Sequence, residues 1–339
     1  MRLIKTEDAV GHVLCHDMTQ IIKDQYKDAR FRKGHVVTEE DIPVLLSMGK
    51  EHLYVWEMTS GMVHENDAAE RLLALCGQEN MIRSGVKEGK IELKAACDGV
   101  FLVDSARLVA VNSQDEVMIA TRKSGMAVRE GDKLAGMRVI PLIIEEEKLR
   151  KAEQAAGDKP LLSLKPYVRK TACIVATGGE VKKGLIKDTF TPVVIDKLKT
   201  YGIETLEVVY SGDGVENVRD AVLAMREKKP DMILCPGGMS VDPDDNTPGG
   251  IKAAGANIIA YGAPVLPGAM FLLGYFDDGM PVMGLPGCVM YAGATVFDLV
   301  LPKIAADVPV TCADLAALGE GGLCLGCKPC HYPICPFGK

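Results

Sequence analysis

Short apolar runs alternate with helix-like segments from residue 170 onward, and this alternation narrows the possible folds more than any other feature of the chain. Residues 171–176 lack a polar face, as expected of a strand buried on both sides of a sheet. Strands connected through helices form a parallel sheet with helices on both faces. We therefore predict an α/β fold whose C-terminal part is a three-layer, doubly wound, mostly parallel sheet. Further strands are expected at 205–210, 231–235 and 281–285. Helices are expected from Pro192 (with Thr191 as its cap), Val215, Thr247 and near Val289.

The 339 residues exceed what one hydrophobic core usually supports, so we expect several domains. Residues 1–57 combine short strand-like runs with one helix. Residues 64–80 have the apolar spacing of an amphipathic helix, 91–142 a β pattern broken by turns, and 145–156 a charged helix. Gly-Asp-Lys-Pro at 157–160 is the expected linker. The predicted domains are 1–57 (small α+β), 58–160 (accessory helix and β-rich region), 165–312 (the α/β domain) and 313–339 (a cysteine-rich tail).

The charge pattern limits the classes of partner. The formal net charge is −7 and no stretch is rich in Lys or Arg, which excludes nucleic-acid binding through a basic surface. A small anion fits this charge, because backbone N–H groups can hold a phosphate. The apolar runs are shorter than the ~20 residues of a membrane-spanning helix, and the charged start of the chain lacks the apolar core of a signal peptide. We expect a cytoplasmic protein that does not contact a membrane.

Glycine-containing loops follow all four expected strands of the C-terminal sheet. They are Thr-Gly-Gly-Glu at 177–180, Ser-Gly-Asp-Gly at 211–214, a longer loop at 236–248, and Gly-Leu-Pro-Gly-Cys at 284–288. One such loop is also what a tight turn or a plain helix cap looks like. Parallel strands end at one edge of a sheet, however, and ligands bind there. The four loops therefore predict a ligand site, in which Glu180, Asp213 and Asp245 form a carboxylate cluster around Mg²⁺.

The ordered set T-G-x-E, an Asp in the next loop, G-G-x-S-V-x-x-x-D-x-T-P and G-L-P-G resembles the molybdopterin-binding domain over about residues 170–305. That domain occurs in molybdopterin adenylyltransferases and molybdotransferases. More loosely, G-H-V-L at 11–14 and K-G-H at 33–35 resemble the accessory region of a bacterial molybdotransferase-like subgroup. The resemblance implies that the 165–312 domain binds molybdopterin or adenylated molybdopterin. It also implies a transferase that inserts molybdate into the adenylate with Mg²⁺ and releases AMP.

The resemblance assigns roles to individual residues of this chain. Glu180, Asp213 and Asp245 would be catalytic, by holding Mg²⁺ against phosphate oxygens. The residues expected to bind the pterin phosphate are Thr177, Gly178, Gly179, Gly237, Gly238, Ser240, Thr247, Pro286 and Gly287. The expected partners are a small-molecule pterin phosphate and molybdate, a molybdoenzyme apoprotein as recipient, and further copies of the chain in a homo-oligomer.

Several positions depart from the family pattern. Gly179 replaces the Asp of T-G-D-E, Asp244 replaces an Arg, and Cys288-Val289 replaces Asn-Pro, while the M-D-G-Y-A segment of molybdotransferases is absent. These departures leave open a second interpretation, a non-catalytic carrier or insertion chaperone that delivers the molybdenum cofactor to a molybdoenzyme. Release of AMP would separate the two. A third interpretation, a nucleotide-binding regulator, rests on fold analogy alone.

Eleven cysteines are present, and four crowd the last sixteen residues with the spacing C-x2-C-x2-C-x4-C. Such spacing in a cytoplasmic protein is typical of metal binding rather than of disulfides. An iron–sulfur cluster and Zn²⁺ both fit, the latter with four thiolates or with three and His331. The alternative is a flexible tail with redox-sensitive thiols. The predicted metal ligands are Cys324, Cys327, Cys330 and Cys335. Several of the other seven lie in apolar runs and are expected to be buried thiols.

Overall fold

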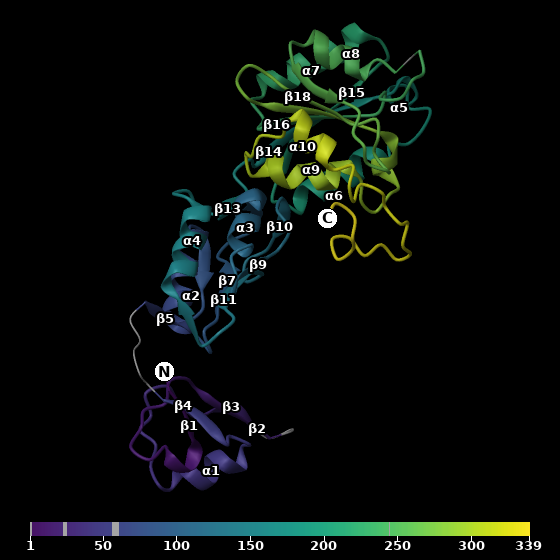
Figure 1. Cartoon of the computed structure of the whole chain (residues 1–339). Coiled ribbons are helices and arrows are strands. Elements are labelled where there is room, and N and C mark those ends of the chain that lie inside the picture. The colour runs from purple at the N-terminus through teal and green to yellow at the C-terminus, as the bar shows by residue number, and fades with distance from the viewer. Residues whose placement is uncertain (1, 23–25, 56–60, 244) are drawn as a thin grey trace. The chain divides into compact units, whose positions relative to one another are not determined.

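The computed structural model describes residues 2–22, 26–55, 61–243 and 245–339 (Figure 1). Two compact units, called here the first and the second unit, make up the chain. The first unit is Met1–Ala96, Val103–Ser124 and Gly131–Ser163, and the second is Cys97–Leu102, Gly125–Glu130 and Leu164–Lys339. The predicted boundary between residues 57 and 58 and the departure at Asp244 lie outside the described residues.

The N-terminal part of the first unit is an α+β arrangement. Its elements are β1 (Arg2–Lys5), η1 (Thr6–Asp8), β2 (Met18–Ile22), β3 (Tyr26–Phe31), α1 (Asp41–Ser47) and β4 (His52–Val55). β1 pairs with β4 and β2 with β3, both antiparallel. Leu14, Leu45 and Leu53 are buried in the core between them. Soon after α1 ends, Gly49 has a φ of +73°, a left-handed conformation in which glycine carries no steric penalty.

Residues 61–166 form short antiparallel sheets with three helices. The elements are β5 (Met62–His64), α2 (Glu65–Cys76), β6 (Met81–Arg83), β7 (Ile91–Ala95), β8 (Gly99–Val103), α3 (Ser105–Asn112), β9 (Val117–Thr121), β10 (Met126–Val128), β11 (Lys133–Val139), β12 (Ile143–Glu145), α4 (Glu146–Ala156) and β13 (Leu162–Pro166). The strand orders are β6-β7-β11-β9, β10-β8-β13 and β12-β5. The predicted amphipathic helix and the charged helix are α2 and α4.

The sequence prediction for 91–142 was wrong at α3, which interrupts the expected β pattern. The Asp104 carboxylate caps this helix by accepting the backbone N–H of Arg107 at 3.0 Å. The Arg107 guanidinium then donates to the carbonyl oxygens of Ala156 at 2.5 Å, Lys159 at 2.6 Å and Pro160 at 3.0 Å. The predicted linker at 157–160 is therefore tied to α3 by direct hydrogen bonds.

The second unit contains a six-stranded sheet. Its elements after residue 166 are β14 (Thr171–Thr177), α5 (Gly179–Lys182), α6 (Phe190–Lys199), β15 (Glu204–Ser211), α7 (Val215–Glu227), β16 (Met232–Pro236), α8 (Thr247–Ala253), β17 (Asn257–Tyr261), β18 (Leu272–Tyr275), β19 (Pro281–Leu285), η2 (Gly287–Met290), α9 (Val296–Ala305) and α10 (Cys312–Ala317). The strand order is β15-β14-β16-β19-β18-β17. The first four strands are mutually parallel, and β18 is antiparallel to both its neighbours.

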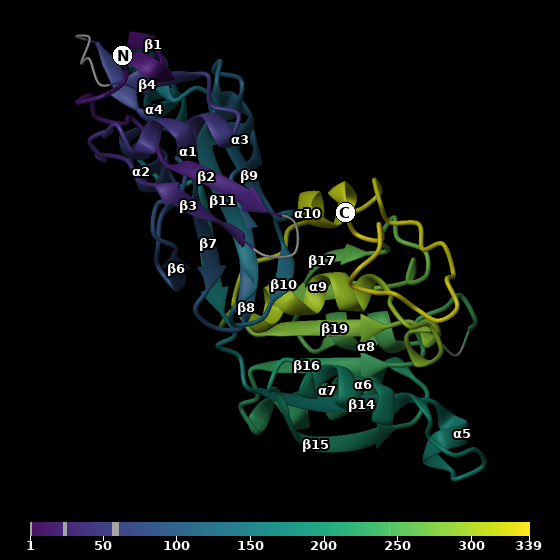
Figure 2. The same cartoon turned by 90° about the horizontal axis from the view of Figure 1, so that it is seen from below.

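Two separate hydrophobic cores lie on the two faces of this sheet. Successive side chains of a strand point to opposite faces. Ile174 of β14 accordingly packs into the core beneath α6 and α9, whereas Cys173 and Val175 pack into the core beneath α7 and α8. All three side chains are fully buried. The predicted three-layer, doubly wound fold is therefore confirmed, and Figure 2 shows β14, β16 and β19 running in the same direction.

Three details of the second unit differ from the sequence prediction. β17 and β18 were not predicted, and they extend the parallel sheet with antiparallel pairs. The helix expected near Val289 is only the short 3₁₀ turn η2, and α9 begins at Val296, where Thr295 and Asp298 form a reciprocal capping box. α6 begins at Phe190, two residues before Pro192, the expected first helical residue. Within the described ranges, no helix has the length and apolar character needed to cross a membrane.

Candidate ligand site

The site predicted from the loops is an edge of the parallel sheet. β15, β14, β16 and β19 are neighbours in that order, and all four end at the same edge because they are parallel. The loops that follow them are called here the rim, and they comprise residues 178–180, 212–214, 237–243, 245–246 and 286–288. Figure 2 shows α5, which follows β14, at this edge. The four glycine turns therefore lie along one side of the second unit, where parallel sheets bind their ligands.

Hydrogen bonds connect the third rim loop to residues that border the first and fourth loops. The hydroxyls of Thr177 and Thr247 lie 2.9 Å apart, and the Thr247 hydroxyl also donates to the carbonyl oxygen of Gly237 at 2.9 Å. The N–H of Gly237 donates to the carbonyl oxygen of Leu285 at 3.2 Å. The Thr247 side chain is 0% exposed, whereas Thr177 and Gly237 are half-buried. Residues far apart in the sequence thereby hold the rim in one arrangement.

The third loop contains two glycines that no other residue could replace without strain. Gly237 has a φ of +94° and Gly238 a φ of +57°. A Cβ at Gly237 would lie 2.5 Å from the carbonyl oxygen of Thr177, and a Cβ at Gly238 would lie 2.5 Å from the hydroxyl oxygen of Thr247. Real Cβ atoms do not approach so closely. These glycines therefore let the backbone of the third loop pack directly against its neighbours.

Asp213 connects the second rim loop to the first. Its carboxylate accepts the N–H of Gly179 at 3.0 Å. The same carboxylate also fills the space into which a Cβ at Gly179 would project. Position 179 is the one at which the resembled family carries an aspartate. Here the carboxylate at this point of the rim comes instead from the next strand's loop.

The other two predicted carboxylates are less enclosed. Glu180 is exposed in the first turn of α5, and the half-buried Asp245 accepts the N–H of Asp242 at 3.2 Å. Among the residues that the structure describes, no group of three or more His, Cys, Asp or Glu side chains is placed to hold a metal ion. Glu180, Asp213 and Asp245 thus share the rim without forming such a group by themselves.

The remaining predicted site residues lie on the rim or border it. Gly178 is in the first loop with a φ of +142°, Ser240 is exposed in the third, and in the fourth loop Pro286 is buried and Gly287 exposed. Burial raises the pKa of the Cys288 thiol next to them, so this thiol is protonated at neutral pH. Which of these residues contact a ligand stays a prediction.

Sequence reasoning missed two residues, one that supports the rim and one that holds α6 and β15 together. The phenol of Tyr261 donates to the carbonyl oxygen of Met239 at 3.0 Å and so holds the third loop from β17. Asp188 accepts the N–H groups of Phe190 and Thr191 at the start of α6, and its other oxygen accepts the Tyr210 hydroxyl at 3.1 Å. An aspartate just before a helix is a recognisable cap signal. Tyr261 lies on an unpredicted strand, where no comparable signal is present.

The four cysteines of the tail are free thiols. Cys324 and Cys335 are half-buried, whereas Cys327 and Cys330 are exposed. Their sulfur atoms are not gathered into a metal-binding group in the described residues. The metal expected at these residues stays a prediction.

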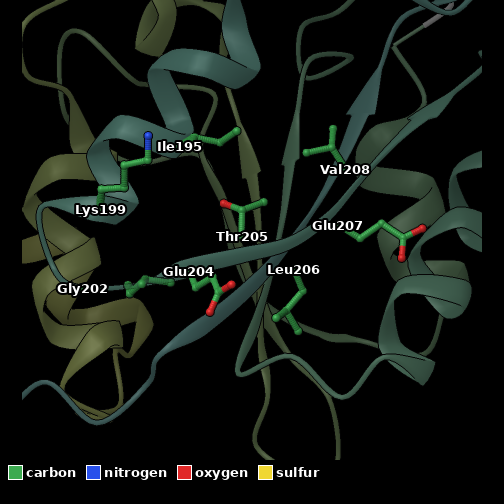
Figure 3. A pocket seen from close by; sticks show the side chains of 9 residues that line it. Ile195, Lys199, Gly202, Glu204, Thr205, Leu206, Glu207 and Val208 are labelled. Atoms are coloured by element: carbon green, nitrogen blue, oxygen red, sulfur yellow. The ribbon is translucent and has the colours of Figure 1, made fainter.

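A separate pocket of about 610 Å³ lies away from the rim, along the outer strand β15 and α6 (Figure 3). Its lining residues are Ile195, Lys199, Gly202, Ile203, Glu204, Thr205, Leu206, Glu207 and Val208. Its strand residues belong to the amino-terminal and middle parts of β15, opposite the end at Ser211 where the rim begins. The pocket is open and contains none of the linked glycine loops, so we place the ligand site at the rim instead.

Replacing Thr247 with valine should loosen the rim. The substitution preserves shape but removes the hydrogen bonds to Thr177 and to the Gly237 carbonyl. Leaving these buried polar groups unpaired should lower the free energy of unfolding by about 1–3 kcal/mol. Chemical denaturation measures the change. The matched control is Thr200→Val, which alters an exposed hydroxyl at the end of α6 and should change stability by less than about 0.5 kcal/mol. Equal effects of the two substitutions would contradict the proposed role of Thr247.

The fold and the rim define an α/β domain with a ligand site at the ends of four parallel strands. Residues 173–306 match a family model described as "Probable molybdopterin binding domain". This part of the second unit is therefore a domain of the molybdopterin-binding family, as the resemblance predicted. Residues 3–57 match a domain of unknown function, DUF8806.

Similarity to individual proteins covers parts of the chain. A CinA-like protein of Mycobacterium tuberculosis is 33% identical over 76 residues, which are 22% of this chain and 18% of that protein. The chain therefore matches less than a fifth of that relative's length. The molybdopterin biosynthesis enzyme MoaB of Thermus thermophilus is 16% identical over 42% of this chain and 98% of its own, with a TM-score of 0.36. The molybdopterin biosynthesis protein MoeA of Pyrococcus horikoshii is 15% identical over 76% of this chain and 82% of its own, with a TM-score of 0.34.

Proposed function

We propose that the rim binds molybdopterin or its adenylate, and that the protein acts in molybdenum cofactor biosynthesis. The observation that carries this proposal is the family match over residues 173–306, which includes all four rim loops. The linked loops support it, because they offer a preformed backbone surface at the edge where parallel sheets bind ligands. The ligand's phosphate would be held by N–H groups of the third loop around Gly238.

The carboxylates of the rim fit a magnesium ion that is bound together with the ligand. Asp213 and Asp245 are oxygen donors of the kind Mg²⁺ prefers, and Glu180 adds a third at the end of β14. Mg²⁺ usually combines one or two carboxylates with substrate phosphates and water. Because these three side chains lie apart, they suit an ion that is also coordinated by ligand phosphates and water better than one held by protein ligands alone. When bound, the ion would neutralise phosphate charge and so favour cleavage of a phosphoanhydride.

The reaction that fits this arrangement is molybdate insertion into adenylated molybdopterin with release of AMP. Asp213 supports turnover, because its carboxylate occupies the space next to Gly179 where the resembled family has an aspartate. Purified protein supplied with adenylated molybdopterin, Mg²⁺ and molybdate should release more than one molecule of AMP per protein chain. If the ligand binds but no AMP is released, the alternative is favoured, a carrier or insertion chaperone for a molybdoenzyme. The absent M-D-G-Y-A segment and the cysteine-rich tail support that alternative.

Asp245→Asn should weaken binding of adenylated molybdopterin about tenfold in the presence of Mg²⁺, because it removes a charged ligand while keeping the size and the bond to Asp242. Without Mg²⁺ the variant and the wild type should bind alike. Equilibrium binding under anaerobic conditions measures both values. The control is Asp277→Asn, an exposed aspartate in the turn between β18 and β19, at the sheet edge opposite the rim. Unchanged Mg²⁺-dependent affinity in Asp245→Asn would remove this residue from the site.

A further inference from the structure

The last part of the chain forms a closed loop. The N–H of Gly338 donates to the carbonyl oxygen of Gly321 at 3.0 Å, which joins the two ends of the segment 321–338. We call this segment the thiol loop. It contains neither a helix nor a regular strand, apart from a single bridge between Leu323 and Leu266. Loops of this length without secondary structure are uncommon in compact proteins and usually serve a function.

Three contacts fix the thiol loop to the body of the second unit. The N–H of Cys324 donates to the carbonyl oxygen of Leu266 at 2.8 Å. In the middle, the Tyr332 hydroxyl donates to the carbonyl oxygen of Asp298 in α9 at 3.0 Å. Near the end, Phe337 is buried in the core beneath α9. The thiol loop is therefore anchored at both ends and at one point between them, and it is not a free tail.

The four thiols are distributed in a regular way over this loop. Cys324 and Cys335 pack against the core at its base, three residues inward from Gly321 and from Gly338 respectively. Cys327 and Cys330 are exposed in the part between them. Four thiols from one closed loop, with two held at the base and two in the span, supply the full ligand set of a tetrahedral metal centre.

The cysteines elsewhere behave differently. Burial raises the pKa of the Cys76 and Cys235 thiols to about 12, so these are unreactive core residues. Cys312 is exposed at the start of α10 and lies outside the thiol loop. The concentration of half-buried and exposed thiols in one anchored loop is thus particular to this segment.

We propose that the thiol loop binds one thiophilic metal centre, Zn²⁺ or a [4Fe–4S] cluster, through Cys324, Cys327, Cys330 and Cys335. The sulfur atoms are not gathered in the structure, so binding must draw Cys327 and Cys330 toward the base. Cys324 and Tyr332 are held by hydrogen bonds, so the segment 325–331 between them is the part that would carry Cys327 and Cys330 inward. All four thiols lose their protons to become thiolates, so binding releases protons and weakens at low pH.

The proposed centre lies beside the rim. The Sγ and Cβ atoms of Cys330 occupy the space next to Gly293, where a side chain at that position would project. Gly293 follows η2, the element that begins in the fourth rim loop, and its carbonyl oxygen accepts a hydrogen bond from Lys197 at 3.4 Å. Figure 2 shows the C-terminal segment on the same side of the second unit as α5. Drawing Cys330 off Gly293 on metal binding would therefore act on the neighbourhood of the fourth loop.

Metal analysis of the full chain purified without oxygen tests this proposal. We expect about one zinc per chain, or about four iron with matching sulfide, either as purified or after reconstitution with Zn²⁺ or with iron and sulfide. A cluster would show visible charge-transfer absorption, and zinc would leave the protein colourless. Cys327→Ser/Cys330→Ser should lose at least nine-tenths of the metal, whereas Cys312→Ser, the exposed thiol outside the loop, should keep it. Wild-type protein that takes up neither metal, or a double variant with unchanged content, would overturn the proposal.

A second measurement covers the case in which the double variant does not fold. In folded wild-type protein carrying the metal, a thiol reagent should modify four fewer cysteines than after chelation, and circular dichroism should confirm that the α/β domain persists. Equal numbers of reactive thiols before and after chelation would contradict the four-thiolate site. Neither experiment involves the pterin ligand, so the result is independent of the function proposed for the rim.

Discussion

Gly237→Ala is expected to abolish binding of adenylated molybdopterin and to lower the free energy of unfolding by about 2–4 kcal/mol. Two costs combine at this position. A residue with a Cβ pays for the left-handed φ of +94°, and its Cβ would lie 2.5 Å from the Thr177 carbonyl oxygen. The clash would push the third loop away from the end of β14 and strain its hydrogen bond to Leu285. Anaerobic equilibrium binding and chemical denaturation measure the two effects.

A second glycine separates the two costs. Gly255 has nearly the same backbone conformation, with a φ of +91°, but no atom lies within 4 Å of where its Cβ would be. Gly255→Ala should therefore cost about 1–2 kcal/mol of stability and leave ligand binding intact. The difference in stability and in ligand binding between Gly237→Ala and Gly255→Ala measures the effect of the close contact between position 237 and Thr177. If Gly237→Ala still binds the adenylate with wild-type affinity, the third loop is not the phosphate site.

Moving the carboxylate of Asp213 back to position 179 should reverse a loss of ligand binding. Asp213→Gly removes a carboxylate from the rim and should weaken Mg²⁺-dependent binding by about tenfold or more. Gly179→Asp alone places a side chain where the Asp213 carboxylate already lies, which should weaken binding and destabilise the fold. The double variant has one carboxylate and the space for it, and Gly179 does not need a positive φ.

The double variant is therefore expected to bind more tightly than either single variant. The interaction between the two substitutions is obtained from the four affinities as a double-mutant cycle. Asp213→Asn is the matched control, because its side-chain oxygen can still accept the Gly179 N–H while the charge is lost. A double variant that binds no better than the weaker single variant would show that the position of the carboxylate, and not only its presence, matters at this rim.

Much of the second unit could be predicted because its parallel strands are buried on both faces. β14, β16 and β19 stand out as short apolar runs, and their loops follow at once in the sequence. β17 is only partly buried, and it pairs antiparallel with β18 outside the alternation of strands and helices. α3 was missed because its valines and its asparagine are poor helix formers, and its packing against α4 and β9 is not visible in a local pattern.

The same reasoning explains how much of the candidate site could be predicted from the sequence. The loop residues could be named because each loop directly follows a strand. The bond between the Thr177 and Thr247 hydroxyls joins positions seventy residues apart, and no local pattern indicates it. The placement of the Asp213 carboxylate against Gly179 likewise depends on β15 lying next to β14 in the sheet. Sequence could identify the parts of the rim, whereas their mutual support follows only from the topology.

The burial of Phe337 also determines which truncations of this protein would be informative. A chain cut after residue 320 would lose the four clustered cysteines and, with them, an aromatic ring that fills the interior beneath α9. The vacated space would weaken the layer that supports the end of β19. A defect in such a shortened chain could come either from the lost core packing or from the lost thiols. Serine substitutions remove the thiols and keep Phe337 in the core.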